Sequence, residues 1–398
     1  SANEVPWMNN SLKRLIRHRQ IALHNGNLKE YNQLRNKVNR ERKACRGKYY
    51  EAKVKDLKNR KPAQWWKEIK QLSGFSKVEN KSPITDLQHL AKEGEDPTHL
   101  ANVINNSFLS PMRTFTPLDT PVLKSSTIPH NQVSPDPVSE LSVIKKLSSL
   151  NSNKASGPDG IPAWVLKDNA DILAAPVTDI LNTSFRERQV PSSWKSADIA
   201  PLPKTSPVTD VNKHLRPISL TPILSKVGED FIVDGYIKPA IIAKIDKNQY
   251  GTIPNSSTTH ALISMLHNWY KDTDGNGSTV RVMLFDFRKA FDFIDHSILM
   301  AKLQNYDLPP WVIDWIASFL TDRKQRVKLA HDCFSEWGSI KAGVPQGTKL
   351  GPWLFLVMIN DIEVSGVNLW KYVDDTSIAE TVHKGQPSEI QVAVDDLV

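Results

Sequence analysis

Residues 367–379 read Val-Asn-Leu-Trp-Lys-Tyr-Val-Asp-Asp-Thr-Ser-Ile-Ala and place two adjacent carboxylates, Asp374 and Asp375, between two apolar runs. Apolar runs on either side of a short polar pair are typical of a β-hairpin. We therefore predict a strand over residues 367–372 and a return strand over residues 376–379, with the paired aspartates at the turn. Such a hairpin taken alone is usually only a polar turn, so its meaning depends on the rest of the chain.

A second apolar strand also ends on a carboxylate. Residues 280–286 read Val-Arg-Val-Met-Leu-Phe-Asp, and an Asp-Gly-Asn-Gly turn precedes them at residues 274–277. Asp286 lies 88 positions before Asp374, so only the fold could bring the two together. Mg²⁺ prefers oxygen ligands, and two such ions about 3.5–4 Å apart can stabilise both oxygens of an in-line displacement at phosphorus. The pattern predicts that Asp286, Asp374 and Asp375 hold two Mg²⁺ ions, or Mn²⁺ as a substitute.

Helical periodicity and strand signals are mixed along the chain without regular alternation, which favours an α+β fold. Helices are expected over residues 8–60, 62–74, 98–108, 141–147, 163–186, 222–243, 297–305 and 309–321, with strand signals over residues 325–341. Trp65 and Trp66, in the second of these helices, are interpreted as core residues rather than as platforms for stacked bases.

The composition excludes several classes of protein. Apolar residues make up 39 % and charged residues 24 % of the 398 residues, which is enough to bury a core and unlike a disordered chain. The most apolar stretch, residues 353–359, is far shorter than the roughly 18 to 20 residues of a membrane helix, so no membrane partner is expected. Two distant cysteines, Cys45 and Cys333, cannot form a four-cysteine zinc site and suggest an intracellular protein, nuclear or cytoplasmic.

The positive charge is concentrated at the N-terminus. Residues 1–80 hold 20 Lys and Arg against 7 Asp and Glu, whereas the remainder holds 31 against 36. A basic segment joined to a part with clustered carboxylates fits a nucleic-acid enzyme, although a solvated helix surface would look the same. We predict a basic helical extension over residues 1–80, a Pro/Ser/Thr-rich connecting region with a short helix over 81–137, and the main folded part over 138–398.

Five motifs in the main part follow one another in an order that resembles the reverse transcriptases of non-LTR (LINE-type) retrotransposons. They lie at residues 154–162, 215–220, 285–292, 343–352 and 372–375. The resemblance implies the fingers and palm of a right-hand polymerase, with an antiparallel palm sheet. It also implies an RNA-directed DNA polymerase that uses an RNA template, a DNA primer or target, and dNTPs.

The resemblance implies a role for individual residues. Asp286 and Asp374 would bind both metal ions, with Asp375 in support. Phe291 would be a steric gate that collides with a ribose 2′-OH, unless it is a plain core residue. Gln346 and Gly347 would lie against the nucleotide and the template base, unless they form only a turn.

Further residues would bind the substrate or support the fold. Lys204 and Arg216 would hold the triphosphate as paired cations, unless they are surface charges. Val373 would line the sugar pocket, unless it is simply a buried strand residue. Three residues of the motifs have structural roles in this interpretation: Asp292, Gly157 and Asp159.

The sequence departs from the family pattern at two places. Residues 249–258 carry Thr252 where an aromatic residue is usual and Asn255 where glycine is usual, which affects packing near the template. The sequence starts at Ser1 and stops at Val398, soon after the aspartate pair, without the thumb or the endonuclease of such elements. We therefore expect a fragment that extends primers poorly on its own.

Two other functions compete with this interpretation. A non-catalytic nucleic-acid-binding remnant would keep the fold but lack activity. An RNA-dependent RNA polymerase also uses paired aspartates at a hairpin, but the bulky Phe291 argues against ribonucleotides as substrates.

Overall fold

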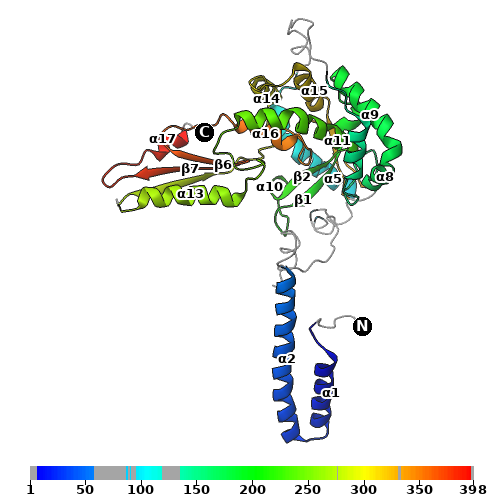
Figure 1. The fold of residues 1–398 in the computed structure, drawn as a ribbon, viewed down its shortest axis with the longest axis vertical. Helices are drawn as coiled ribbons and strands as arrows, with labels where there is room; N and C mark the ends of the chain where they lie inside the picture. The colour runs from blue at the N-terminus through cyan, green and yellow to red at the C-terminus, as the bar shows by residue number, and fades with distance from the viewer. Residues whose placement is uncertain are drawn as a thin grey trace. The chain divides into compact units, whose positions relative to one another are not determined.

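The structure of the chain is a computed structural model that describes residues 7–57, 87, 90, 96–118, 135–275, 277–329 and 333–395. The chain separates into two compact units, Ser1–Lys81 and Ser82–Val398 (Figure 1). Within the described ranges, no helix combines the length and the apolar character that crossing a membrane requires.

The first unit contains a helical hairpin. Helices α1 (Asn10–His24) and α2 (Leu28–Leu57) pack side by side around Leu12, Ala22 and Val38, which are almost completely buried. The turn uses Gly26 at φ 71°, and the Asn27 side chain accepts a hydrogen bond from the Glu30 amide at 3.2 Å, which caps α2. The predicted helix over residues 62–74, with Trp65 and Trp66, lies outside the described residues.

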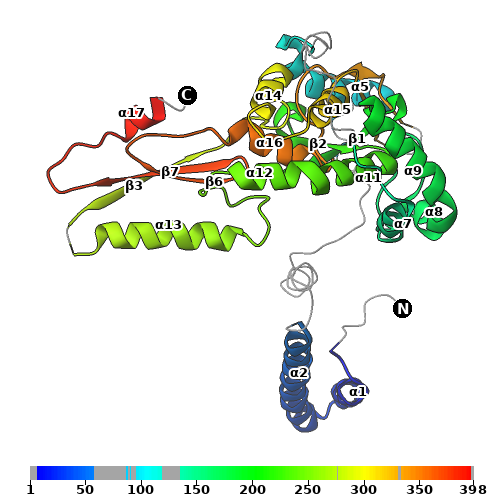
Figure 2. The ribbon, with the colours of Figure 1, turned by 45° about the horizontal axis from the view of Figure 1, so that its top comes forward.

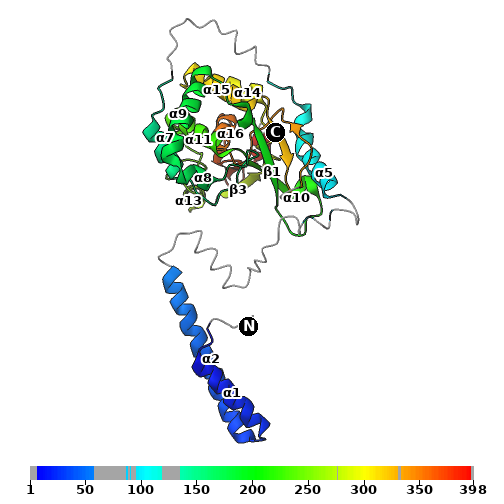
Figure 3. The same ribbon diagram turned by 90° about the vertical axis from the view of Figure 1, so that its right-hand side faces the viewer.

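The core of the second unit is a group of helices around α16. The group comprises α7 (Glu140–Ser148), α8 (Ala163–Asp168), α9 (Ala170–Glu187), α11 (Ile223–Ile232), the π-helical η4 (Val233–Ile237), α12 (Lys238–Lys244), α14 (His296–Leu303), α15 (Pro310–Leu320) and α16 (Gly351–Ile359). Helix α16 is apolar on all sides because it lies inside the group, with α9, α11, α14 and α15 around it (Figure 3).

Helix boundaries partly differ from the predicted ones. The helices expected over residues 141–147, 297–305 and 309–321 are confirmed. The segment 163–186 is instead two helices, separated at Asn169, and 222–243 is interrupted by the π-helical turn η4. The π-helical turn is followed by Pro239, the second residue of α12, which has no amide to donate to the preceding turn. The break at Asn169 contains no proline.

A four-stranded sheet lies beside this core. Its order is β2 (Leu215–Leu220), β1 (Ser196–Pro203), β4 (Lys324–Val327) and β5 (Gly338–Ser339), with β1 and β4 parallel and the other pairs antiparallel. The short elements η3 (Ser192–Lys195) and α10 (Val211–His214) flank β1 and β2.

Helix α5 (Pro97–Leu109), followed by η2 (Ser110–Thr114), packs against this sheet. Its buried Leu100, Ile104 and Phe108 share one apolar cluster with Ile199 and Val327 of the strands. The sequence assigns this helix to a connecting region that ends at residue 137. In the structure it is instead an integral part of the second unit.

The second sheet has three antiparallel strands in the order β3 (Thr279–Phe285), β7 (Asp375–Val382) and β6 (Asn368–Tyr372). Helix α13 (Thr258–Thr273) covers one face and the short α17 (Ile390–Asp395) lies on the other (Figure 2). Successive side chains of a strand point to opposite faces of the sheet, so each face has apolar residues for one helix to cover. Trp370 and Ala379 pack toward Met265 of α13, while Leu369 and Ile378 pack toward α17. Strand β3 is an edge strand, and its Leu284 side chain is exposed.

Candidate active site

The paired aspartates lie at a two-residue turn between β6 and β7. Tyr372 pairs with Asp375, so Val373 and Asp374 form the turn itself. Val373 has φ 58°, a left-handed conformation that a β-branched residue rarely adopts and that is typical of tight hairpin turns. We call β6, this turn and β7 the aspartate hairpin. The predicted hairpin is confirmed, with β7 longer than expected.

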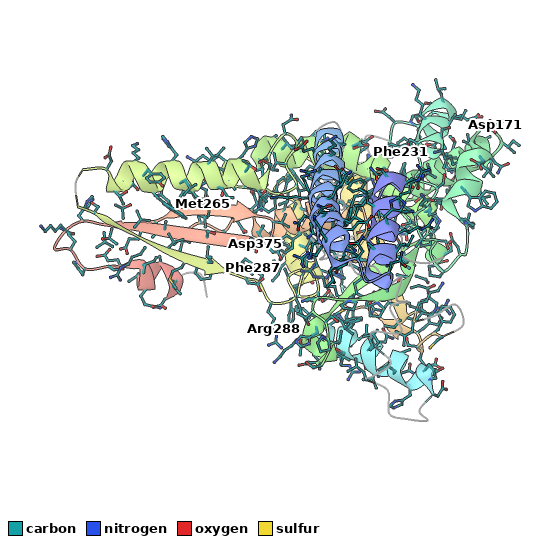
Figure 4. The ribbon with its side chains drawn as sticks, turned by 90° about the horizontal axis from the view of Figure 1, so that it is seen from below. Asp171, Phe231, Met265, Phe287, Arg288 and Asp375 are labelled. Carbon is teal, nitrogen blue, oxygen red and sulfur yellow. The ribbon has the colours of Figure 1, made fainter. Side chains whose placement is uncertain are left out.

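Asp286 reaches the same end of the sheet from the other neighbour of β7. Phe285 pairs with Thr376, and the same register continued by one residue places Asp286 opposite Asp375. Figure 4 shows Phe287, just beyond β3, close to Asp375. The structure therefore brings the three predicted carboxylates together, from strands far apart in the sequence.

At this end of the sheet, the charges of the neighbouring carboxylates affect the pKa of Asp374. Burial raises the pKa of Asp374 above its usual value, and the negative charges of Asp375 and Asp286 raise it further. The positive charge of Arg216 opposes this shift. Because these negative charges lie close together, a bound cation would stabilise the ionised carboxylates.

Among the described residues, no three His, Cys, Asp or Glu side chains are grouped tightly enough to hold a metal ion by themselves. Mg²⁺ at phosphate-transfer sites is usually bound by one or two carboxylates, several waters and the substrate phosphates, rather than by a complete protein cage. The carboxylate oxygens and their mutual repulsion fit that kind of open site.

The loop of residues 343–347 is fastened to the segment that follows Asp286. The amides of Gly343 and Val344 donate to the carbonyls of Ile294 (2.7 Å) and Phe291 (2.9 Å). The buried His296 donates from Nε2 to the carbonyl of Gly343 at 2.7 Å. Gly343 has φ 80°, and a Cβ there would lie 2.8 Å from the carbonyl oxygen of Phe291, so only glycine fits.

Phe291 is held rigidly in this region. Its ring stacks on Phe355 of α16, with centroids 4.8 Å apart and planes inclined by 22°. It is partly buried against the helical core, as a core residue would be, and its role as a steric gate stays a prediction. One side of the ring packs as a core residue while the remainder is accessible.

Four of the predicted nucleotide-binding residues, Lys204, Arg216, Gln346 and Gly347, come from three segments that are joined by hydrogen bonds. The Ser219 amide of β2 donates to the carbonyl of Gln346 at 2.7 Å, which ties the loop to the strand that carries Arg216. Gly347 has φ 108°, and a Cβ there would lie 3.0 Å from the Ser219 carbonyl. Lys204 follows β1, and its amide donates to the carbonyl of His214 at 2.8 Å.

Asp292 lies behind this loop and is nearly buried. The side-chain amide of Gln346 donates to its carboxylate at 3.5 Å, a long contact. Burial raises the pKa of Asp292 to about 6, although Lys289, Gln346 and Lys204 act in the opposite direction. Asp292 therefore contacts a predicted nucleotide-binding side chain as well as packing within the fold.

The raised pKa of Asp292 gives a testable pH dependence. Because the folded protein binds this proton more tightly than the unfolded chain, the contribution of Asp292 to stability is complete below pH 3.8 and is lost as pH rises through about 6. The loss amounts to about 3 kcal/mol. The free energy of unfolding of the wild type minus that of Asp292→Asn, measured by denaturant titration, should fall by this amount between about pH 4 and 7. A difference that is independent of pH would contradict the assignment.

Gly157 and Asp159 form a separate turn. The Gly160 amide donates to the Gly157 carbonyl at 3.0 Å, and the Ile161 amide donates to the Asp159 carboxylate at 3.3 Å. A Cβ on Gly157 would lie 2.5 Å from the nitrogen of Pro222, so this turn packs on the chain just after β2. Neither residue has a hydrogen bond to the carboxylates in the described part of the chain.

Three buried polar residues around the site were not assigned a role from the sequence. Gln249 lies beside the aspartate hairpin, Lys371 lies within it, and Glu229 lies behind the 343–352 motif. The only signal for Lys371 is a charge within an apolar strand, and Glu229 stands among other charged residues of α11 and has no such signal. Gln249 opens the segment whose Thr252 and Asn255 depart from the family pattern, and both of these have positive φ, 64° and 63°.

Comparison with known proteins agrees with this geometry. Residues 202–396 match the family described as reverse transcriptase (RNA-dependent DNA polymerase). The RNA-directed DNA polymerase from mobile element jockey of Drosophila melanogaster is 30 % identical over 250 residues, covering 58 % of this chain and 26 % of that protein.

More distant elements are also similar. The probable RNA-directed DNA polymerase from transposon X-element of Drosophila melanogaster is 27 % identical over 238 residues, covering 59 % of this chain and 26 % of the relative. The Pol polyprotein from the type-1 retrotransposable element R2 of Bradysia coprophila is 25 % identical over 239 residues, again covering 59 % and 26 %. The chain thus spans about a quarter of the length of these curated relatives. The motifs stand in order and the three carboxylates meet at one end of the sheet. The part of the chain at residues 202–396 therefore belongs to the reverse transcriptases, and it is similar to those of non-LTR retrotransposons.

Proposed function

We propose that this chain adds deoxynucleotides to a DNA primer along an RNA template. The observation that supports this most strongly is the meeting of Asp286, Asp374 and Asp375 at one end of the three-stranded sheet. These side chains would hold two Mg²⁺ ions, or Mn²⁺ in their place, with Asp375 in the weaker supporting position. When bound, the ions supply charge stabilisation for the attacking and leaving oxygens.

The residues around the carboxylates would bind and orient the nucleotide. The positive charge of Arg216 acts on Asp374, so a triphosphate beside the carboxylates would also be attracted by its guanidinium. Lys204, whose charge acts on Asp292 and Lys289, would bind the same phosphates. The loop fastened to β2 would place Gln346 and Gly347 against the base pair, and Val373 would line the sugar pocket.

Phe291 would select the sugar. Stacking on Phe355 fixes the ring, and a fixed ring cannot move aside for an additional hydroxyl group. A ribose 2′-OH would therefore collide with it, whereas a deoxyribose would fit. This argument favours DNA synthesis over RNA synthesis.

Primer extension on an RNA template, with Mg²⁺ and either dNTPs or NTPs, tests the proposed function. DNA products that require dNTPs are expected. Equal use of NTPs would indicate an RNA polymerase instead. Undetectable extension by a chain that still binds the template would support the non-catalytic alternative.

We also propose that the helical hairpin of the first unit binds nucleic-acid phosphates. Between residues 7 and 57, the sequence has 14 Lys and Arg but only 4 Asp and Glu. Helix α2 is 30 residues long and polar on nearly all sides, apart from Val38, which packs on α1. Such a surface suits a polyanion, because its basic residues outnumber its acidic residues.

Replacing Lys37, Arg40 and Lys43 with glutamine should weaken RNA binding by the full chain. All three side chains are exposed and lie away from the contact of Val38 with α1. If each contacts one phosphate, the slope of log Kd against log salt should decrease by about 2. Fluorescence anisotropy with a labelled RNA at several salt concentrations measures the slope.

The matched control keeps the charge but exchanges the residue types (Lys37→Arg, Arg40→Lys, Lys43→Arg). It should retain the wild-type slope, because counterion release depends on charge. An unchanged slope in the glutamine variant would show that this part of the hairpin does not contact RNA.

A further inference from the structure

The chain between α12 and α13 covers the free edge of β6. Gln249 forms a parallel bridge with Lys371. The Lys371 amide donates to the Asn248 carbonyl, and the Tyr250 amide donates to the Lys371 carbonyl, both at 2.8 Å. We call residues 246–251 the brace segment. It gives the aspartate hairpin a second neighbour, because β6 is otherwise an edge strand.

The side chain of Gln249 contacts the turn that carries Asp374. It is only 5 % exposed, and its Oε1 accepts hydrogen bonds from the amides of Val373 (3.0 Å) and Gly251 (2.8 Å). The Val373 amide belongs to the residue in the left-handed conformation. One side-chain oxygen therefore binds the backbone immediately before the catalytic acid.

Gly251 allows the brace segment to approach this turn closely. A Cβ at position 251 would lie 2.5 Å from both the nitrogen and the Cγ2 of Val373. Such a distance does not occur between real atoms, so any other residue would push the segment away. The hydrogen bond from Val373 to Gln249 therefore depends on the close approach of the Gly251 backbone to Val373.

The same segment is anchored at its other end by a buried charge. Lys371 has a fully buried side chain, and its Nζ lies 2.7 Å from the carboxylate of Asp246. The Nζ also donates to the carbonyls of Asn360 and Ile362, both at 3.1 Å, at the end of α16. The Asp246 amide donates to the Asn360 side chain at 2.8 Å. The brace segment is thus fixed to the helical core before it reaches the turn.

We propose that Gln249 is a positioning residue for the aspartate hairpin, whose side-chain carbonyl holds the Val373 backbone and thereby sets the direction of the Asp374 carboxylate. The proposal rests on the proposed polymerase function only for its effect on catalysis. Gln249 itself touches neither substrate nor metal in this scheme. Its amide oxygen acts through the amides of Val373 and Gly251, to which it is hydrogen-bonded. The role therefore requires a hydrogen-bond acceptor, and an apolar side chain of the same size is not sufficient.

The test compares the wild type with Gln249→Met, which keeps the shape but removes the acceptor. Hydrogen exchange of the Val373 amide in the full chain should accelerate about tenfold, the effect of one lost hydrogen bond. Mn²⁺ binding, followed by electron paramagnetic resonance, should weaken several-fold. In extension assays kcat should decrease, while the KM for dNTP should change little.

Two further variants separate positioning from general packing. Gln249→Glu keeps a carbonyl-type acceptor and should restore slow exchange at Val373. Gln325→Met removes another buried glutamine, which donates to Asn105 at 3.1 Å in the four-stranded sheet. It should lower the melting temperature without accelerating exchange at Val373.

Wild-type exchange at Val373 in Gln249→Met, or equally fast exchange in Gln249→Glu, would overturn the proposal. If Gln249→Met does not fold, Gln249→Asn provides the same comparison, because its shorter side chain cannot reach both amides. Exchange and Mn²⁺ binding are measured without turnover. An inactive wild type would therefore refute the proposed function and leave these two measurements to judge the role of Gln249.

Discussion

Replacing Asp374 with asparagine is expected to lower the rate of primer extension by at least about 1,000-fold, because one of the two proposed main metal ligands and its charge are removed. The shape of the side chain is kept, so the aspartate hairpin should remain folded. Burial and the charges of Asp375 and Asp286 raise the pKa of Asp374, which means that its ionised form is unfavourable in the folded chain. Asp374→Asn should therefore melt at the same temperature as the wild type or above it.

The control for this prediction is Asp171→Asn. Asp171 is exposed on α9, in the helical group and far from Asp375 in Figure 4. It should extend primers at the wild-type rate. RNA binding, measured by anisotropy, should be unchanged in both variants. Substantial extension by Asp374→Asn would show that the hairpin is not the catalytic centre.

Replacing Glu229 with leucine is expected to lower the free energy of unfolding by about 3–5 kcal/mol, the typical result of removing one partner from a buried pair of charges. Glu229 lies on α11 and is completely buried. Its carboxylate accepts hydrogen bonds from the amides of Lys349 (2.6 Å) and Leu350 (3.3 Å) and from the hydroxyl of Ser225 (3.0 Å). Lys349 and Leu350 lead directly into α16, so Glu229 joins the 343–352 motif to the core.

The charge that Glu229 would leave behind belongs to Arg323. This guanidinium is also buried, and burial lowers its pKa to about 10 while Glu229 acts in the opposite direction. Burial likewise raises the pKa of Glu229, against the effect of the two amides and Arg323. Each charge thus reduces, without cancelling, the cost of burying the other.

The double variant Glu229→Leu/Arg323→Met provides the decisive comparison. Removing both charges should restore a large part of the stability lost in Glu229→Leu, because no charge is left unpaired. Chemical denaturation of the wild type, both single variants and the double variant measures the coupling. Strictly additive losses would mean that the two residues do not interact.

Much of the candidate site could be predicted because its chemistry is concentrated in short motifs. The hairpin around Asp374 is visible in the sequence as two apolar runs flanking a polar pair. The apolar strand before Asp286 is equally clear. What the sequence could not supply is the supporting structure. Gln249 binds Val373 across 124 positions, and Glu229 binds Lys349 across 120, so no local pattern indicates either contact.

Parts of the fold escaped prediction for identifiable physical reasons. Strands β1 and β2 contain prolines, which normally argue against a strand inside a sheet. Pro201 lies directly opposite Pro217, so two of the three missing amide donors fall in one opposed pair, and the third, Pro203, is the last residue of β1. Helix α13 was also missed. Its apolar residues Leu262 and Ile263 point outward, 56 % and 59 % exposed, which obscures the helical face that packs on the sheet.

The position of β3 at the edge of its sheet has a consequence for the alignment of the candidate site. Within the described residues, Asp286 follows a strand that is held by hydrogen bonds on one side only, to β7, whereas the aspartate hairpin is supported on both. A slip of β3 by a single residue would turn its side chains to the opposite face of the sheet. The alignment of the two halves of the site thus depends on one ladder of seven opposed pairs, from Thr279 with Val382 to Phe285 with Thr376.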